Sequence, residues 1–433
     1  MVPTTGARTV TVSGFGAADT WVLDLADPKR PVRVTETTVD GGPGEHRVSF
    51  VAGETPRRYL AVDPAAARAP TSILADEPSR LRTRRHRVDH LIITTGDMVE
   101  AAGLLAGQRR AQGLRTMVVD LEDIYDEFNY GIQNAEAIWR FLRYAHLFWR
   151  QGPRFVVFAG EGSHDYKNYL GHADAVVPTL LVPTPQGLFP SDNLFADVLG
   201  DDRLPEMAAG RIPAMNADEL LAVSRKIIAY ENATLDRRAK RAIVAADAPD
   251  GAGNFPADSE QLAAVFPGDY DVERLHLDSV DLDSARRRLV DALNEGKTFM
   301  NFIGHGGAMA IGNRGLLTIA DLDALDNGDR LPIVTVQTCL AGQFGFPGID
   351  SIGELLVLRP DRGAVAVWAP SGLSFNNQAR FLGEEFYRGV FEGGEDVLGN
   401  SIRGAQRRYV DDGNDPYLLD IYNLIGDPAT IMQ

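Results

Sequence analysis

Residues 298–307, TFMNFIGHGG, and residues 332–342, PIVTVQTCLAG, share one pattern: an apolar block of strand length that runs into glycine-flanked polar residues. Similar apolar blocks recur from Asp89 onward and alternate with longer segments that have the 3.6-residue period of helices. This alternation is typical of βαβ units, so the sequence predicts an α/β fold with a mostly parallel sheet. The predicted strands are 90–95, 115–120, 154–160, 242–247, 298–304, 332–338 and 363–369, and the predicted helices include 98–113, 134–150, 217–233 and 284–296.

The first 88 residues have a different pattern, with short alternating segments, turn formers such as GGPG (41–44) and no intervening helices. Such segments are typical of a small β-sandwich. A stretch rich in proline, alanine and arginine (64–87) then predicts a linker. We therefore expect a β-rich N-terminal domain with its linker in residues 1–88 and an α/β domain in residues 89–433, with 89–235 and 236–433 as a further division into sub-domains.

Composition limits the classes of function. The 433 residues are 44% hydrophobic and 24% charged, as in globular proteins that bury a core. No apolar run reaches the ~18 residues of a membrane-spanning helix. The 60 acidic and 43 basic side chains give a net charge of −17, which disfavours binding to nucleic acid or anionic membranes and favours basic peptides.

The chain has a single cysteine, Cys339, which excludes a disulfide within the chain and a zinc cluster built on cysteines. The first residues, MVPTTGARTV, lack the basic and apolar regions of a signal peptide. Strand-like sequence follows at once, as in a fragment of a longer precursor.

Two reactive side chains follow predicted strands. His305 comes directly after one strand and Cys339 directly after the next, so in a parallel sheet both would emerge at the same edge. A nearby imidazole can take the proton of a thiol, and the thiolate is the nucleophile. The main-chain amides of Gly306 and Cys339 would be donors to an oxyanion. The alternatives are a small buried cysteine and an ordinary loop histidine.

The sequence resembles the gingipain-type cysteine peptidases (peptidase family C25) of the caspase-like clan. The resemblance covers roughly residues 88–432 and is carried by NFIGHGG (301–307), PIVTVQTCLAGQF (332–344), GAVAVWAPSG (363–372) and the segments 125–145, 158–168, 191–213 and 422–432. It implies a caspase-like three-layer α/β/α sandwich with a mostly parallel sheet. The β-sandwich-like N-terminal region fits the β-rich part that often precedes this domain.

The resemblance further implies roles for individual residues. Cys339 would be the nucleophile and His305 the general base. An acidic residue supports the histidine in the family, and Asp247 is the acid nearest to its position. Asp247 would then orient the imidazole, although a helix N-cap or a calcium ligand are alternatives.

Other residues are implied in substrate binding. Asp258 falls close to the family position that pairs with a basic residue before the scissile bond. It reads equally as an N-cap, with Gln261 completing a capping box. In the clan, the segment at the end of the strand after the cysteine lines the substrate groove. The residues of this chain that the resemblance places in that wall are Trp368, Ser371 and Ser374.

Calcium is a structural ion in many such domains, and the expected chemistry requires no cofactor. Clustered carboxylates are suitable calcium ligands, with a solvated acidic loop as the alternative. The carboxylates in question are Asp192, Asp197, Asp201, Asp202 and Glu206.

The leading hypothesis is a cysteine endopeptidase that cleaves peptide or protein substrates after Arg or Lys through a Cys339 thioester. The first alternative is a transpeptidase or sortase-like processing enzyme of the same family, which would pass the acyl group to an amine. The second is a catalytically silent surface or adhesion module. A small-molecule α/β enzyme is more remote, because no phosphate-binding glycine loop follows the first predicted strand. The resemblance implies a secreted or cell-surface location.

Overall fold

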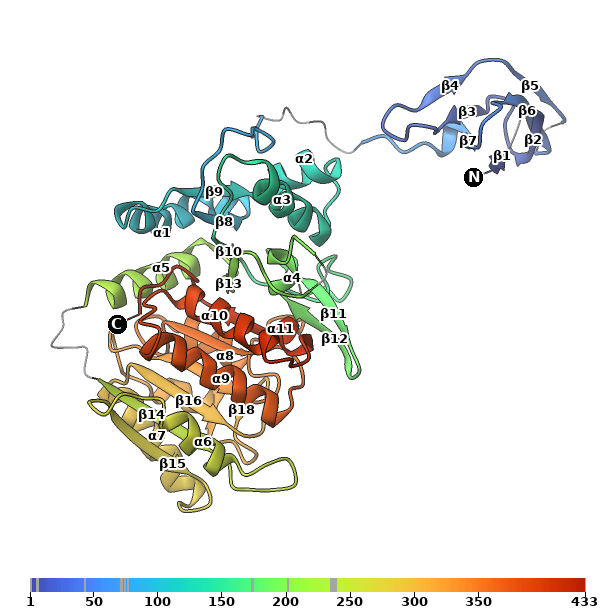
Figure 1. Ribbon diagram of the computed structural model, residues 1–433. Helices are drawn as coiled ribbons and strands as arrows, with labels where there is room; N and C mark the ends of the chain where they lie inside the picture. The colour runs from blue at the N-terminus through green and yellow to red at the C-terminus, as the bar shows by residue number, and fades with distance from the viewer. Residues whose placement is uncertain are drawn as a thin grey trace. The chain divides into compact units, whose positions relative to one another are not determined.

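The computed structural model describes residues 2–4, 8–42, 44–70, 73, 75, 78–172, 175–200, 202–233 and 240–432. The chain divides into two compact units, residues 1–77 and 78–433 (Figure 1). No helix among these residues is long and apolar enough to cross a membrane.

The first unit consists of two small antiparallel sheets. Their strand orders are β1-β7-β3-β4 and β2-β6-β5. Both sheets contribute to one core, in which Val22 of one sheet meets Val48 and Phe50 of the other. This is the sandwich-like arrangement that the alternating sequence predicts. The strands are β1 (Val2–Thr4), β2 (Arg8–Phe15), β3 (Trp21–Asp24), β4 (Val32–Val34), β5 (Thr37–Asp40), β6 (His46–Ala52) and β7 (Arg57–Val62).

The second unit is built on a ten-stranded sheet of order β15-β14-β16-β20-β21-β22-β13-β10-β8-β9. Neighbouring strands are parallel except β21 and β22. The fold is therefore the predicted α/β class with a mostly parallel sheet. The strands are β8 (His90–Thr94), β9 (Thr116–Asp120), β10 (Phe155–Ala159), β13 (Ala208–Ile212), β14 (Arg241–Ala246), β15 (Asp271–His276), β16 (Phe299–Ile303), β20 (Ile333–Gln337), β21 (Ala366–Pro370) and β22 (Tyr422–Ile425).

The antiparallel pair in the middle of this sheet has a consequence for function. Strands β22, β13, β10, β8 and β9 run opposite to the other five. The carboxyl ends of the two sets therefore lie at opposite edges. Only β14, β15, β16, β20 and β21 end at the edge that carries His305 and Cys339.

Helices flank the sheet (Figure 1). Helices α1, α5 and α8 pack in one row, and α6, α9 and α10 in another. The helices are α1 (Val99–Ala111), α2 (Leu121–Asn129), α3 (Ala135–Phe148), α4 (Asn193–Ala196), α5 (Ala217–Asn232), α6 (Phe255–Ala263), α7 (Leu282–Glu295), α8 (Ile352–Leu358), α9 (Asn376–Phe391), α10 (Leu398–Asp411) and α11 (Tyr417–Ile421). A hairpin of β11 (Leu180–Thr184) and β12 (Gly187–Ser191) and a small sheet of β17 (Gly306–Gly307), β18 (Ala310–Ile311) and β19 (Leu317–Thr318) complete the unit.

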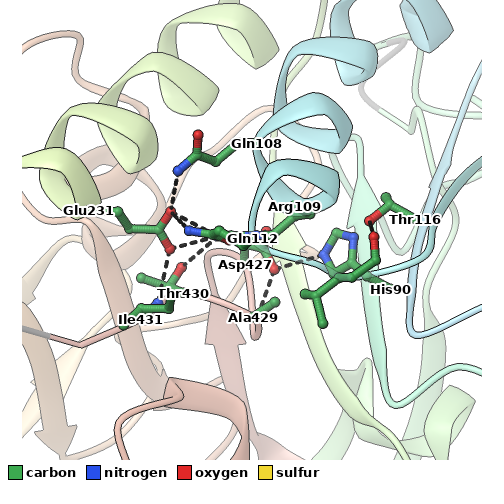
Figure 2. Close-up of polar contacts among 11 residues, drawn as sticks. His90, Gln108, Arg109, Gln112, Thr116, Glu231, Asp427, Ala429, Thr430 and Ile431 are labelled. Carbon is green, nitrogen blue, oxygen red and sulfur yellow. Dashed lines mark hydrogen bonds and ion pairs between the residues drawn. The ribbon is translucent and has the colours of Figure 1, made fainter.

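A buried ion-pair network joins the C-terminal segment to the first part of this unit (Figure 2). Asp427, just after β22, accepts hydrogen bonds from His90 Nε2 of β8 (3.0 Å) and Arg109 Nε of α1 (2.8 Å). Arg109 also binds Glu231 of α5 at 2.6 Å, and Glu231 accepts the main-chain N–H of Ile431. Burial alone would raise the pKa of Asp427, but Arg109 and His90 hold that pKa well below its usual range.

A second buried polar contact lies between the loop after β10 and helix α8. Glu161 and Glu354 lie within hydrogen-bonding reach of each other, and Glu354 also accepts the Ser351 N–H at 2.7 Å. Burial raises the pKa of Glu354 to about 7 and that of Glu161 well above its usual value. The charged groups that face the pair are Arg211 of β13, which favours ionisation of Glu161, and Asp350, which opposes it. The two carboxyls therefore hold at least one proton between them at mildly acidic pH.

We expect Asp427→Asn to lower the free energy of unfolding by about 3 kcal/mol, because it removes the anion that Arg109 and His90 share in the interior. Urea unfolding of the whole chain measures this. The matched control is Glu136→Gln, which breaks an exposed pair with Arg140 and should cost about 0.5 kcal/mol or less. Equal effects of the two substitutions would contradict the importance of the network.

We also expect the stability of the protein to decline as pH rises from about 4.5 to about 7. A carboxyl whose pKa is higher in the folded than in the unfolded state stabilises the fold while it is protonated and loses that contribution as pH passes the folded value. Glu354→Gln cannot ionise, so its loss of stability between pH 5 and pH 8 should be smaller than that of the wild type. Urea titrations at the two pH values decide this, and an unchanged difference would show that Glu354 does not titrate in this range.

Candidate active site

The loops that carry His305 and Cys339 lie side by side. Strands β16 and β20 are parallel neighbours, and Ile303 pairs with Gln337 at their carboxyl ends. His305 and Cys339 each come two residues later. A Cβ added to Gly306 would lie 2.5 Å from the Thr338 Oγ1 and 3.3 Å from the Cys339 carbonyl oxygen. Glycine is therefore required for this close approach of the two loops.

The thiol of Cys339 is half-buried and contacts the main chain of Ser374. Its Sγ accepts the Ser374 N–H at 3.4 Å and lies 3.8 Å from the Ser374 carbonyl oxygen. Burial raises the pKa of Cys339, so the resting thiol is protonated at neutral pH. The next residue, Leu340, has a φ of 58°, a left-handed conformation that is unusual for leucine. Such a strained backbone is frequent at functional sites.

The imidazole of His305 is held by a carboxylate that the sequence analysis did not identify. His305 Nε2 lies 2.7 Å from Asp250 Oδ2, and the ring packs edge-on against Phe255 with centroids 5.3 Å apart. Hydrogen bonds from the Ala252 N–H and from His305 lower the pKa of Asp250. Asp250 is the first residue of the Asp-Gly turn after β14. Because aspartate is common in such turns, its position in the sequence did not indicate a contact with the histidine.

Asp247, which was expected to orient the imidazole, contacts the backbone instead. Its carboxylate accepts the main-chain N–H groups of His305 (2.8 Å) and Asn313 (2.9 Å). Burial raises the pKa of Asp247. The structure therefore assigns the ring contact to Asp250 and the anchoring of the histidine loop to Asp247.

Two residues expected at the groove wall are buried, which corrects the expectation. Trp368 is fully buried in β21 and packs against Phe386 and Tyr422. Ser371 is also fully buried and donates a hydrogen bond to the Pro190 carbonyl oxygen. Trp368 lies on β21 and Ser371 directly after it, and β21 is an inner strand of the sheet. Other elements cover both faces of this strand. Ser374, by contrast, is at the thiol.

Asp258 lies in α6, and its carboxylate is already occupied. Asn376 Nδ2 donates to Asp258 Oδ2 at 2.7 Å, and Arg380 Nε lies 3.5 Å from Asp258 Oδ1. The alternative that Asp258 caps the helix is wrong, because Asn254 is the N-cap and accepts the Ala257 N–H.

Within the described part of the acidic segment, the carboxylates are not grouped as a metal site would require. Asp192 is buried and makes a two-pronged ion pair with Arg211. Glu206 accepts the N–H groups of residues 198 and 199, and Asp202 accepts that of residue 204. Asp197 ends the short helix α4 as its C-cap, and Asp201 lies outside the described residues. Among the described residues, no three acidic, histidine or cysteine side chains are grouped so that they could hold a metal ion.

Comparison with known proteins gives the same assignment of fold. Gingipain R2 of Porphyromonas gingivalis is 23% identical over 342 residues, which cover 75% of this chain and 43% of that protein. The chain thus spans less than half the length of this relative. The crystal structure of the Arg-specific cysteine proteinase gingipain R (RGPB) superimposes with a TM-score of 0.68 at 20% identity, covering 80% of this chain and 78% of that one.

A second solved structure matches the whole length of this chain. Dimeric latent PorU from Porphyromonas gingivalis aligns with a TM-score of 0.55 at 17% identity over 100% of this chain and 38% of its own. The family model of peptidase family C25 matches residues 83–433, four-fifths of the chain, and the protein therefore belongs to this family.

Proposed function

We propose that the protein is a cysteine endopeptidase with Cys339 as nucleophile and His305 as general base. The observation that carries this proposal is the pairing of β16 with β20, which brings the thiol and imidazole loops to one edge of the sheet. The carboxylate of Asp250 on the imidazole supports it, because a base held in this way has a defined tautomer.

The hydrogen bond to Asp250 assigns the proton of the neutral ring to Nε2, which leaves the lone pair on Nδ1 as the base. In the proposed reaction, Nδ1 takes the thiol proton as Sγ attacks the substrate carbonyl carbon. The amides of Gly306 and Cys339 are the proposed donors to the oxyanion. The imidazolium returns its proton to the leaving amine, and a water molecule then hydrolyses the thioester. The chemistry requires no cofactor.

The proton transfer is proposed to follow substrate binding. At rest the thiol contacts Ser374 and the imidazole contacts Asp250, and burial raises the pKa of Cys339. A substrate bound between the two loops would exclude water. His305 Nδ1 would then accept the proton of the thiol.

Peptides with a basic residue before the scissile bond are the proposed substrates, and the proposed location is outside the cell. The net charge of −17 attracts basic peptides, and Asp258 provides a carboxylate close to the thiol loop. The relatives include proteins named as Arg-specific and Lys-gingipain.

We expect Cys339→Ala to lower kcat/KM on Arg- and Lys-coumarin peptides by at least about three orders of magnitude, because the nucleophile is removed. Labelling of the wild type by an acyloxymethylketone probe should disappear in this variant. Absence of both cleavage and labelling in the wild type would favour the silent module. Products that carry an added amine, instead of free acid, would favour the transpeptidase.

Asp250→Asn should lower kcat by about 10- to 1,000-fold with little change in KM, since an amide favours the wrong tautomer of His305. Asp250→Glu should retain part of the activity. Asp247→Asn is the control: it follows the same strand but touches only the main chain, so we expect a smaller loss of kcat. Steady-state kinetics measure all three variants. A larger loss of kcat at Asp247 than at Asp250 would contradict the role proposed for Asp250 in orienting the imidazole.

A further inference from the structure

Asp258 is connected to the residues around the thiol and the imidazole through Asn376. The Asn376 amide donates to Asp258, and Asn376 lies two residues after Ser374, which contacts Cys339 Sγ. A Cβ on Gly253 would lie 2.4 Å from Asn376 Nδ2, so the loop that begins at Asp250 also abuts this amide. A cation held by Asp258 would therefore be close to the proposed reaction centre.

The protein already supplies such a cation. Helix α9 packs against α6, and Arg380 of α9 reaches Asp258 with its Nε at 3.5 Å. The Nη1 of Arg380 makes two shorter hydrogen bonds, each of 2.9 Å, to Gln261 Oε1 and Glu384 Oε2. The side chains of Arg380 and Asp258 are 25% and 18% exposed, so both can be reached from solvent.

We propose that Arg380 is an internal competitor for the carboxylate of Asp258 and thereby weakens the selection of basic substrates. The inference rests on the proposed role of Asp258 in the peptidase. A substrate guanidinium or ammonium has to replace the Arg380 contact before it gains its own ion pair. Arg380 thus offsets part of the negative charge of Asp258 and Glu384 in the protein without substrate.

The geometry favours exchange over permanent occlusion. The Asp258 contact is the longest of the three that Arg380 makes, whereas charge-assisted hydrogen bonds are usually 2.7–2.9 Å long. Arg380 can give up this contact and keep those to Gln261 and Glu384. Partly exposed ion pairs of this kind contribute little, so the expected effect is a moderate loss of affinity.

The test uses the full chain with Cys339→Ala, which prevents cleavage during binding. Calorimetry measures the dissociation constant of acetyl-Ala-Ala-Arg-Ala-Ala-amide and of the same peptide with citrulline, which is uncharged, in place of arginine. We expect Arg380→Gln to tighten binding of the arginine peptide by about three- to fivefold and to leave the citrulline peptide unchanged. Adding Asp258→Asn to Arg380→Gln should remove the gain.

Arg388→Gln is the matched control, because Arg388 lies on the same helix and binds the same Glu384 but not Asp258. It should leave the affinity unchanged. Arg380→Met, which keeps the apolar stem, replaces Arg380→Gln if the latter fails to fold. Equal affinities of the Arg380 and Arg388 variants, or a gain that survives Asp258→Asn, would overturn the inference.

Hydrolysis of the arginine peptide by the wild-type protein, which has Cys339, is measured separately. A wild type that cleaves, with no gain from Arg380→Gln, rejects the competitor and leaves the proposed peptidase intact. A wild type that neither cleaves nor reacts with the probe, together with a gain that depends on Asp258, rejects the peptidase and leaves the competitor.

Discussion

The site depends on the register between β16 and β20. Five residues of each strand pair in parallel, from Phe299 with Ile333 to Ile303 with Gln337, and the Gly304 N–H continues the ladder to the Gln337 carbonyl oxygen. Both strands therefore end at the same level of the sheet, and the backbone hydrogen bonds between them fix the positions of His305 and Cys339. A slip of one residue would turn every side chain of one strand to the opposite face, and it would also separate the two loops.

Two acidic residues contact His305 in different ways, one at its main chain and the other at its ring. Asp247 is buried and binds main-chain N–H groups, so it holds the loop on which the ring is mounted. Asp250 is partly exposed and binds the ring itself. In the proposed reaction the imidazole changes its charge, and this division suits that change: Asp247 is insulated from solvent, while Asp250 can adjust to the charge of the ring.

The sequence predicted the strands and helices that depend on residues close together in the chain. Apolar blocks identified β16 and β20 to within one residue at each end, and the helix predicted at 134–150 is observed as Ala135–Phe148. Contacts between distant segments could not be read in this way. Trp368 is buried because Phe386 and Tyr422 cover it, and Asp250 reaches His305 because the turn after β14 folds back. The reversal of direction at β22 depends on pairing across the chain, which no local pattern reveals.

The half of the sheet that does not carry His305 and Cys339 contacts the loop after Cys339 directly. After Cys339 the chain crosses toward β13, where Phe344 packs over Arg211 and the Gly345 carbonyl oxygen accepts the His164 N–H at 2.8 Å. Glu161 and Glu354 join the same two regions, and Arg211 is itself held by Asp192. Residues of the segments 158–168 and 191–213 therefore contact and support the loop after Cys339, although they lie far from it in sequence.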